Sequence, residues 1–164
     1  MSSGLEIYTL IHVGISLLAI GSGFIVIFGM LAGKRLDRWT AFFLATTVLT
    51  SLTGFGFPIT GFTPGIIIGI ISLVVLAPAI YARYPGRLAG LWRGVYVVTA
   101  VIAQYLNFFV LIVQSFMKVP ALHSLAPTGS EPPFLIAQIV TLVAFFVLGS
   151  LAVIRFHERP AGKV

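Results

Sequence analysis

The sequence has no cysteine and very little charge. Without cysteine the chain has no disulfide, no thiolate metal site, no cysteine-bound iron–sulfur cluster and no cysteine nucleophile. Only 9% of its 164 residues are charged, compared with roughly 25% in a typical soluble domain. Because 59% of the residues are hydrophobic, this composition argues against a water-soluble domain and predicts an integral membrane protein.

The few charges leave four long stretches of the chain without any Asp, Glu, Lys or Arg. About 20 apolar residues are enough to cross the hydrocarbon core, so three of these stretches have room for one helix each. The fourth, residues 39–82, has room for two, because Pro58 and Pro64 interrupt helix and the glycines near them favour a turn. We therefore predict an all-α bundle of five transmembrane helices in a single domain, residues 1–164. The predicted spans are 7–31, 40–57, 64–82, 94–117 and 134–154.

The basic residues are distributed very unequally between the two predicted sides of the membrane. One side has Lys118 alone, and the other side has all the remaining basic residues. Cytoplasmic flanks are enriched in Lys and Arg, so we expect the N-terminus outside and the C-terminus in the cytoplasm. The net charge of +6 then reflects topology and attraction to membrane lipids, and no nucleic-acid partner is predicted. The basic residues on the predicted cytoplasmic side are Lys34, Arg35, Arg38, Arg83, Arg87, Arg93, Arg155, Arg159 and Lys163.

Small residues recur at helical spacing in the first span. Ala19 and Gly23 are four residues apart, and small residues let two helices approach closely in lipid. We expect this row to form a tight helix contact within the chain. The alternative is that it forms the seam of a homo-oligomer or of a larger membrane complex.

Polar residues in the predicted outer half of the bundle are the candidates for a functional site. His12 is the one ionisable residue placed inside a span, where such residues are costly and indicate function. The candidate ligand-binding residues are His12, Thr53, Asn107, Gln114 and Gln138. We predict a polar pocket open to the outside, beneath the two connecting segments at residues 54–65 and 118–134. The alternative is hydrogen bonding between helices, with threonine hydroxyls returning to their own backbone.

Evidence for a cofactor or for catalysis is sparse in the sequence. His12 and His123 fall on the same predicted side and are the weaker candidates for an outer metal or haem site, whereas His157 falls on the other side. Two histidines without nearby cysteine or clustered carboxylates form an incomplete ligand set. No phosphate-binding glycine loop and no Ser–His–acid set is present. We therefore predict no cofactor and no enzyme activity, with haem or quinone as the remaining alternatives.

Three segments resemble a known group of proteins. The stretches "KRLDRWTAFFLATTVLTSLTGFGFP", "WRGVYVVTAVIAQYLNFFVLIVQ" and "LAPTGSEPPF" are similar to small polytopic inner-membrane proteins of bacteria with no assigned activity. The resemblance implies a multi-pass protein of the bacterial cytoplasmic membrane and supplies no functional residue. Three functions stay open: binding or transport of a small molecule or lipid, an accessory or scaffold subunit of a membrane complex, and a haem- or quinone-binding redox subunit.

Overall fold

A computed structural model describes residues 3–58 and 64–157 of the chain. Within these ranges the protein is all-helical and has no strand, which confirms the predicted all-α class. The helices are α1 (Ser3–Leu31), α2 (Asp37–Gly54), α3 (Pro64–Arg83), α4 (Leu91–Lys118), α5 (Pro120–His123) and α6 (Pro132–Arg155). Arg159 and Lys163 of the basic tail, and residues 59–63 of the predicted loop over the site, lie outside the described residues.

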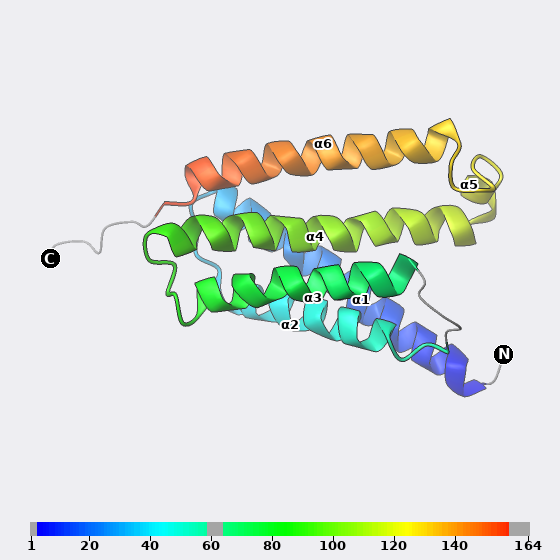
Figure 1. Ribbon diagram of the computed structural model, residues 1–164, viewed down its shortest axis with the longest axis horizontal. Helices are drawn as coiled ribbons and strands as arrows, with labels where there is room; N and C mark the ends of the chain where they lie inside the picture. The colour runs from blue at the N-terminus through cyan, green and yellow to red at the C-terminus, as the bar shows by residue number, and fades with distance from the viewer. Residues whose placement is uncertain (1–2, 59–63, 158–164) are drawn as a thin grey trace, which may run out of the picture.

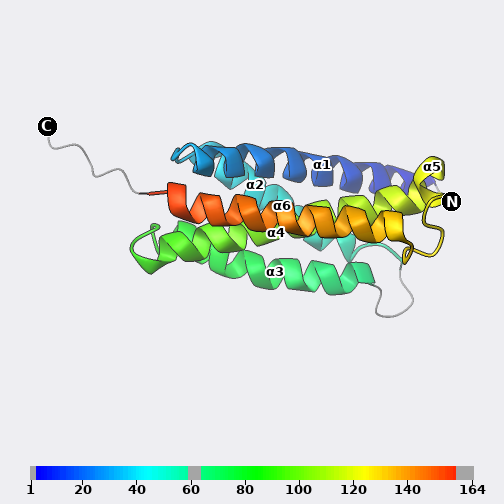
Figure 2. The same ribbon diagram turned by 90° about the horizontal axis from the view of Figure 1, so that it is seen from above.

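The five long helices run side by side in alternating directions (Figures 1 and 2). Figure 1 shows the α1–α2 and α3–α4 connections at one end of the bundle, together with the end of α6. The start of α1, the start of α3 and the short helix α5 lie at the opposite end. Among the described residues, every Lys and Arg except Lys118 belongs to the first end, which we call the basic end. The members are Lys34, Arg35, Arg38, Arg83, Arg87, Arg93 and Arg155.

The predicted number of five apolar spans requires a correction. Four helices, α1, α3, α4 and α6, are long and apolar enough to cross a membrane, and α2 is not among them. Helix α2 has only 18 residues and contains five threonines, a serine, Asp37 and Arg38. At the helical rise it is about 27 Å long, slightly less than the roughly 30 Å of a hydrocarbon core. The absence of charge between residues 39 and 82 concealed this polarity, because hydroxyl side chains carry no charge.

Close packing is concentrated in the half of the bundle next to the basic end. All buried residues of α1 lie between Ala19 and Met30, and those of α3 lie between Ser72 and Arg83. Helix α6 has no buried residue before Thr141. Since interdigitated side chains are what hold helices together in lipid, the helices are less closely packed toward the opposite end.

A buried arginine anchors the basic end. Arg83 at the end of α3 is only 5% exposed, and it donates to the carboxylate of Asp37 at the start of α2. Its guanidinium also lies over the ring of Tyr96, 5.6 Å from the ring centre, and the Tyr96 hydroxyl donates to Thr40 Oγ1 at 3.3 Å. Arg35 approaches the same Asp37 oxygen at 3.4 Å. These contacts tie α2, α3 and α4 together at one level.

A carboxylate organises the segment that enters α6. Glu131 accepts hydrogen bonds from the Thr128 N–H at 3.0 Å, from the Thr128 hydroxyl at 2.9 Å and from the Ser130 N–H at 3.0 Å. Desolvation alone raises the pKa of the Glu131 carboxyl. Hydrogen bonds from Thr128 and other donors lower this pKa by a larger amount, so that it is about 2. The carboxylate therefore stays ionised, and this turn keeps its hydrogen bonds, throughout the physiological pH range.

Candidate functional site

Two residues of α1 face the last turn of α2 at the end of the bundle opposite the basic end. His12 Nδ1 lies 2.8 Å from Thr53 Oγ1, and the Tyr8 hydroxyl donates to the Thr53 backbone oxygen at 2.6 Å. Tyr8 and His12 share one face of α1 because they are four residues apart. This contact joins two of the candidate residues, His12 and Thr53.

The hydrogen bonds of Thr53 indicate which imidazole nitrogen has the proton. The Thr53 hydroxyl donates its single hydrogen to the Leu49 backbone oxygen at 2.7 Å, so toward His12 it acts as an acceptor. Neutral His12 therefore satisfies the contact best as the tautomer with hydrogen on Nδ1. Its Nε2 then has a free lone pair, and within residues 3–58 and 64–157 no hydrogen-bond partner is assigned to it.

An aromatic wall completes this site. The ring of Phe57 meets the Tyr8 ring edge-on, with centroids 5.0 Å apart, and the His12 ring edge-on at 5.1 Å. Gly56 leaves room for this arrangement, because a Cβ at that position would overlap the Tyr8 hydroxyl and the ring would have to shift. We call Tyr8, His12, Thr53 and Phe57 the His12 cluster. It combines one free acceptor nitrogen with an apolar ring surface.

The other candidate residues do not contact the His12 cluster. Asn107 Nδ2 donates to Thr47 Oγ1 at 3.1 Å, which joins α4 to α2. Gln138 Nε2 donates to the Phe109 backbone oxygen at 3.4 Å, which joins α6 to α4. Gln114 is exposed. The five predicted residues are therefore distributed over separate helix contacts, and their role in binding stays a prediction.

Much of the polar surface in the bundle is satisfied locally. The hydroxyls of Thr46, Ser51 and Thr53 donate to backbone oxygens in the preceding turn of α2, as the alternative interpretation expected. In the described part of the chain, three buried side-chain oxygens have no hydrogen-bond partner. They belong to Thr50, Gln104 and Gln138, on three different helices.

Two concave features of the surface lie away from the His12 cluster. The first is a cleft at the basic end, lined in part by Lys34, Arg35 and Arg83, and too narrow to admit a water-sized sphere. The second is an open groove of about 560 Å³ on the outer surface of α1 and α2. Four residues line this groove: Leu18, Arg38, Trp39 and Phe42.

The structure places the two weaker metal candidates on different elements. His12 lies in α1, whereas His123 ends the short helix α5 and is exposed. No contact joins the two rings in the described residues. Across the same residues, no group of three or more His, Asp or Glu side chains could hold a metal ion.

Sequence reasoning missed two members of the site and the anchor of the basic end. Tyr8 and Phe57 lie at the ends of the predicted spans 7–31 and 40–57 and were not named as site residues, although the four-residue spacing of Tyr8 and His12 places them on one helix face. Arg83 and Asp37 were counted only as charges. The signal for their pairing was that Asp37 is one of only two acids on the predicted basic side, the other being Glu158 of the tail.

Comparison of the chain with protein-family models, with curated proteins and with solved structures found no match.

Proposed function

We propose that this chain is a multi-pass protein of the bacterial cytoplasmic membrane that binds an amphipathic small molecule or lipid at the His12 cluster, from the outer side. The observation that carries the proposal is the free Nε2 of His12 next to the Phe57 ring. The bacterial location rests on the resemblance of the quoted segments. Transport of the same ligand is the further possibility that this site allows.

The proposed orientation has the basic end in the cytoplasm and the N-terminus outside. This orientation requires α2 to cross the membrane together with the four helices that are more apolar, α1, α3, α4 and α6. A membrane-spanning α2 is compatible with the structure, because the most polar face of this helix is shielded: Thr40, Thr47 and Ser51 are all buried. Ser51 donates to the backbone of its own helix, and Thr40 and Thr47 accept hydrogen bonds from Tyr96 and Asn107 of α4. Hydroxyls bonded within or between helices can be accommodated at membrane depth.

We expect single-cysteine labelling to confirm this orientation, and the absence of native cysteine makes the experiment clean. Ser124 is exposed at the end that contains α5, and Ala32 is exposed in the α1–α2 connection at the basic end. In intact cells, a membrane-impermeant maleimide should label Ser124→Cys and leave Ala32→Cys unlabelled until the membrane is permeabilised. The reverse pattern would invert the proposed topology.

The His12 cluster offers a ligand two kinds of contact. His12 Nε2 can accept a hydrogen bond from a hydroxyl, amide or ammonium group, while Nδ1 is held by Thr53 at 2.8 Å. The rings of Phe57 and Tyr8 provide an apolar surface beside it. Binding sites for small molecules commonly combine a few polar groups with apolar and aromatic walls. The chemistry therefore fits a molecule with one donor group and an apolar body.

A substitution of His12 can separate binding from folding. Asparagine places its amide nitrogen the same number of bonds from Cβ as histidine Nδ1, so His12→Asn can still donate to Thr53 while Nε2 is removed. We expect this variant to keep the wild-type melting temperature and to lose bound ligand about tenfold, as for one lost hydrogen bond in a desolvated site. Native mass spectrometry of protein extracted gently from its own membrane measures the bound mass.

The matched control is Gln114→Leu, which changes an exposed candidate residue of α4 that makes no contact with the His12 cluster. This variant should retain the bound mass of the wild type. Equal occupancy in wild type, His12→Asn and Gln114→Leu would place the ligand elsewhere. A wild-type chain that has no bound small molecule at all would count directly against a binding function.

The second candidate function is an accessory subunit of a larger membrane complex. It is favoured by the observation that His12 and Asn107 each make a side-chain hydrogen bond to a neighbouring helix of the chain, which is a contact that a purely structural role would use. The same mild extraction distinguishes the two functions. Partner chains that remain bound, without a small molecule, would favour the accessory role.

A further inference from the structure

We propose that the groove on the outer surface of α1 and α2 is a binding site for one anionic phospholipid, with its phosphate on Arg38; in the orientation proposed above, this lipid belongs to the cytoplasmic leaflet. Three of the four lining residues, Leu18, Trp39 and Phe42, are apolar, and the fourth is a cation. The volume of about 560 Å³ lies within the usual range of small-molecule sites, roughly 300 to 1,000 Å³. This site is independent of the His12 cluster and lies nearer the other end of the bundle.

The charge of Arg38 is available for a ligand. Its neighbours Arg35 and Arg83 both approach the carboxylate of Asp37, whereas no ion pair or hydrogen bond is assigned to the Arg38 side chain within the described residues. Arg38 is also exposed. An arginine guanidinium matches a phosphate group because its parallel N–H donors can bind two oxygens at once.

The apolar part of the groove continues from the position of the cation toward the middle of the membrane. Phe42 lies one helical turn beyond Arg38, and Leu18 lies about 20 Å from the Leu31 end of α1 by helical rise. Leu18 is 55% exposed, and Trp39 and Phe42 are 44% and 42% exposed. A cation at headgroup level above an apolar track fits a phosphate and the upper part of one acyl chain.

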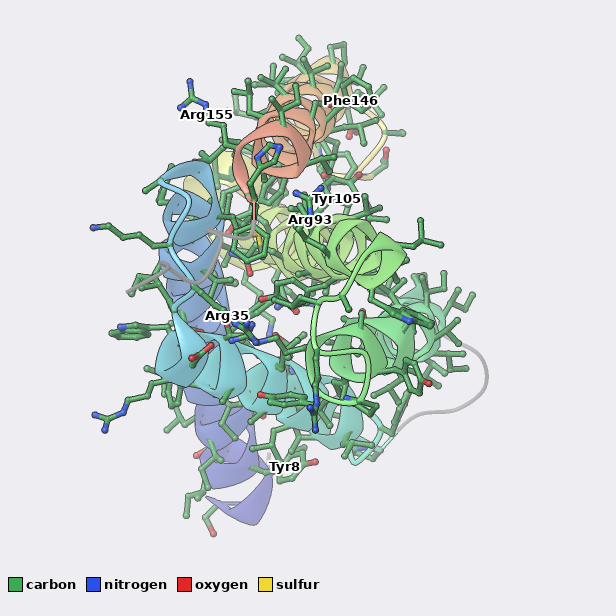
Figure 3. The ribbon with its side chains drawn as sticks, turned by 90° about the vertical axis from the view of Figure 1, so that its left-hand side faces the viewer. Tyr8, Arg35, Arg93, Tyr105, Phe146 and Arg155 are labelled. Carbon is green, nitrogen blue, oxygen red and sulfur yellow. The ribbon has the colours of Figure 1, made fainter. Side chains whose placement is uncertain are left out.

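The aromatic residues give the groove a defined wall. The rings of Trp39 and Phe42 meet edge-on, with centroids 6.3 Å apart and planes at 88°. Tryptophan is favoured at the level of lipid headgroups, where its ring is partly apolar and its N–H remains near polar groups. Figure 3 shows Arg35 pointing toward the centre of the bundle at this end, where it approaches Asp37.

Fluorescence of Trp39 tests this site with a defined probe. The other tryptophan, Trp92, packs against Tyr81 at 4.7 Å, and Trp92→Phe removes its emission while keeping an aromatic ring there. This variant is reconstituted into phosphatidylcholine vesicles that contain 10 mol% phosphatidylglycerol with brominated acyl chains. We expect the groove to prefer phosphatidylglycerol about tenfold over phosphatidylcholine, whose choline offsets the phosphate charge. At 10 mol% the brominated lipid should then occupy the groove about half of the time, roughly fivefold above its share of the bilayer. Quenching of Trp39 fluorescence should therefore exceed the quenching expected if the brominated lipid were distributed at random around the protein.

Two further substitutions in the Trp92→Phe background decide the outcome. Arg38→Gln should reduce quenching to the random level, whereas Arg35→Gln, which removes the same charge from a paired neighbour, should retain the excess. Circular dichroism checks that both variants are folded. Quenching at the random level in the parent protein, or an equal loss in both variants, would overturn the proposal. Brominated phosphatidylcholine at the same 10 mol% in plain phosphatidylcholine vesicles should quench at the random level, because the groove then has no preferred lipid to select.

Discussion

Gly23→Ala is expected to destabilise the bundle by about 1 to 3 kcal/mol, the cost of overpacking a filled core. A Cβ at Gly23 would overlap the side-chain amide of Gln104 and would lie 2.8 Å from Phe43 Cε2. Gln104 is 0% exposed and donates through Nε2 to the Ile20 backbone oxygen at 2.7 Å, so the amide cannot move aside without losing that bond. Unfolding by heat or by denaturing detergent measures the change.

Gly21→Ala is the matched control for this prediction. Gly21 lies in the same helix and is exposed, and a Cβ there would meet nothing within 4 Å. Alanine is favoured over glycine in a helix by about 1 kcal/mol, so this variant should be as stable as the wild type or more stable. If the two variants have the same melting temperature, α1 and α4 do not approach each other closely enough at Gly23 to exclude a methyl group.

A double-mutant cycle assigns the effect to Gln104. Gln104→Ala removes the amide that the new methyl group would strike, so the Gly23→Ala/Gln104→Ala protein should be more stable than the sum of the single changes predicts. We expect a coupling of at least about 1 kcal/mol, within the range found for residues in contact. Strict additivity would mean that Phe43, and not Gln104, restricts this position.

Gln104 also shows how a membrane core can hold a polar group whose hydrogen bonding is incomplete. Its Oε1 is buried without a hydrogen-bond partner, and it lies where a Gly23 Cβ would be. In glycine a Cα hydrogen takes the direction of the missing Cβ, so a Cα–H group faces the oxygen. Such contacts are weak, but they recur at helix interfaces where backbones approach closely. The absence of a side chain at Gly23 is therefore what allows Gln104 to lie between α1 and α4.

The fold was largely predictable because the cost of burying charge in lipid marks the ends of helices. Leu31 ends the predicted first span, three residues before Lys34, and Pro64 begins the predicted third span; α1 ends and α3 begins at these same residues. The small-residue contact at Ala19 and Gly23 was also predicted correctly, since Ala19 is fully buried and Gly23 faces Gln104. The short helix α5 was not predicted, because four residues give no helical pattern.

The candidate site was less predictable, because depth in the membrane does not determine the rotation of a helix. Asn107 and Gln114 are seven residues apart and therefore share one face of α4, yet Asn107 bonds to Thr47 whereas Gln114 is exposed. The helices pack less closely toward the end of the bundle opposite the basic end, so residues on a shared face need not share an environment. His12 and Thr53 come together because Tyr8 and Phe57 pack around them, and aromatic contacts of this kind leave no periodic signal.

Asp37→Asn is expected to destabilise the protein by about 1 to 3 kcal/mol, because it leaves the buried Arg83 charge without its partner. Removing one partner of a fully buried pair costs about 3 to 5 kcal/mol, and exposed pairs contribute about 0 to 1 kcal/mol. Arg83 is 5% exposed, whereas the Asp37 side chain is 70% exposed, so the cost should lie between these limits. Unfolding in mild detergent, compared with the wild type, measures it.

Two companion variants distinguish the buried charge from general effects at the basic end. Arg35→Gln removes the half-exposed second partner of Asp37, 3.4 Å away, and should change stability by less than about 1 kcal/mol. Asp37→Asn/Arg83→Met removes both charges and fills the space with an apolar chain, so it should be more stable than Asp37→Asn alone. If Asp37→Asn costs no more than Arg35→Gln, the Tyr96 ring, whose centre lies 5.6 Å from the guanidinium, is sufficient to stabilise the arginine. The order of stability of the three variants therefore shows how much of the stabilisation of the Arg83 charge comes from Asp37 and how much comes from the Tyr96 ring.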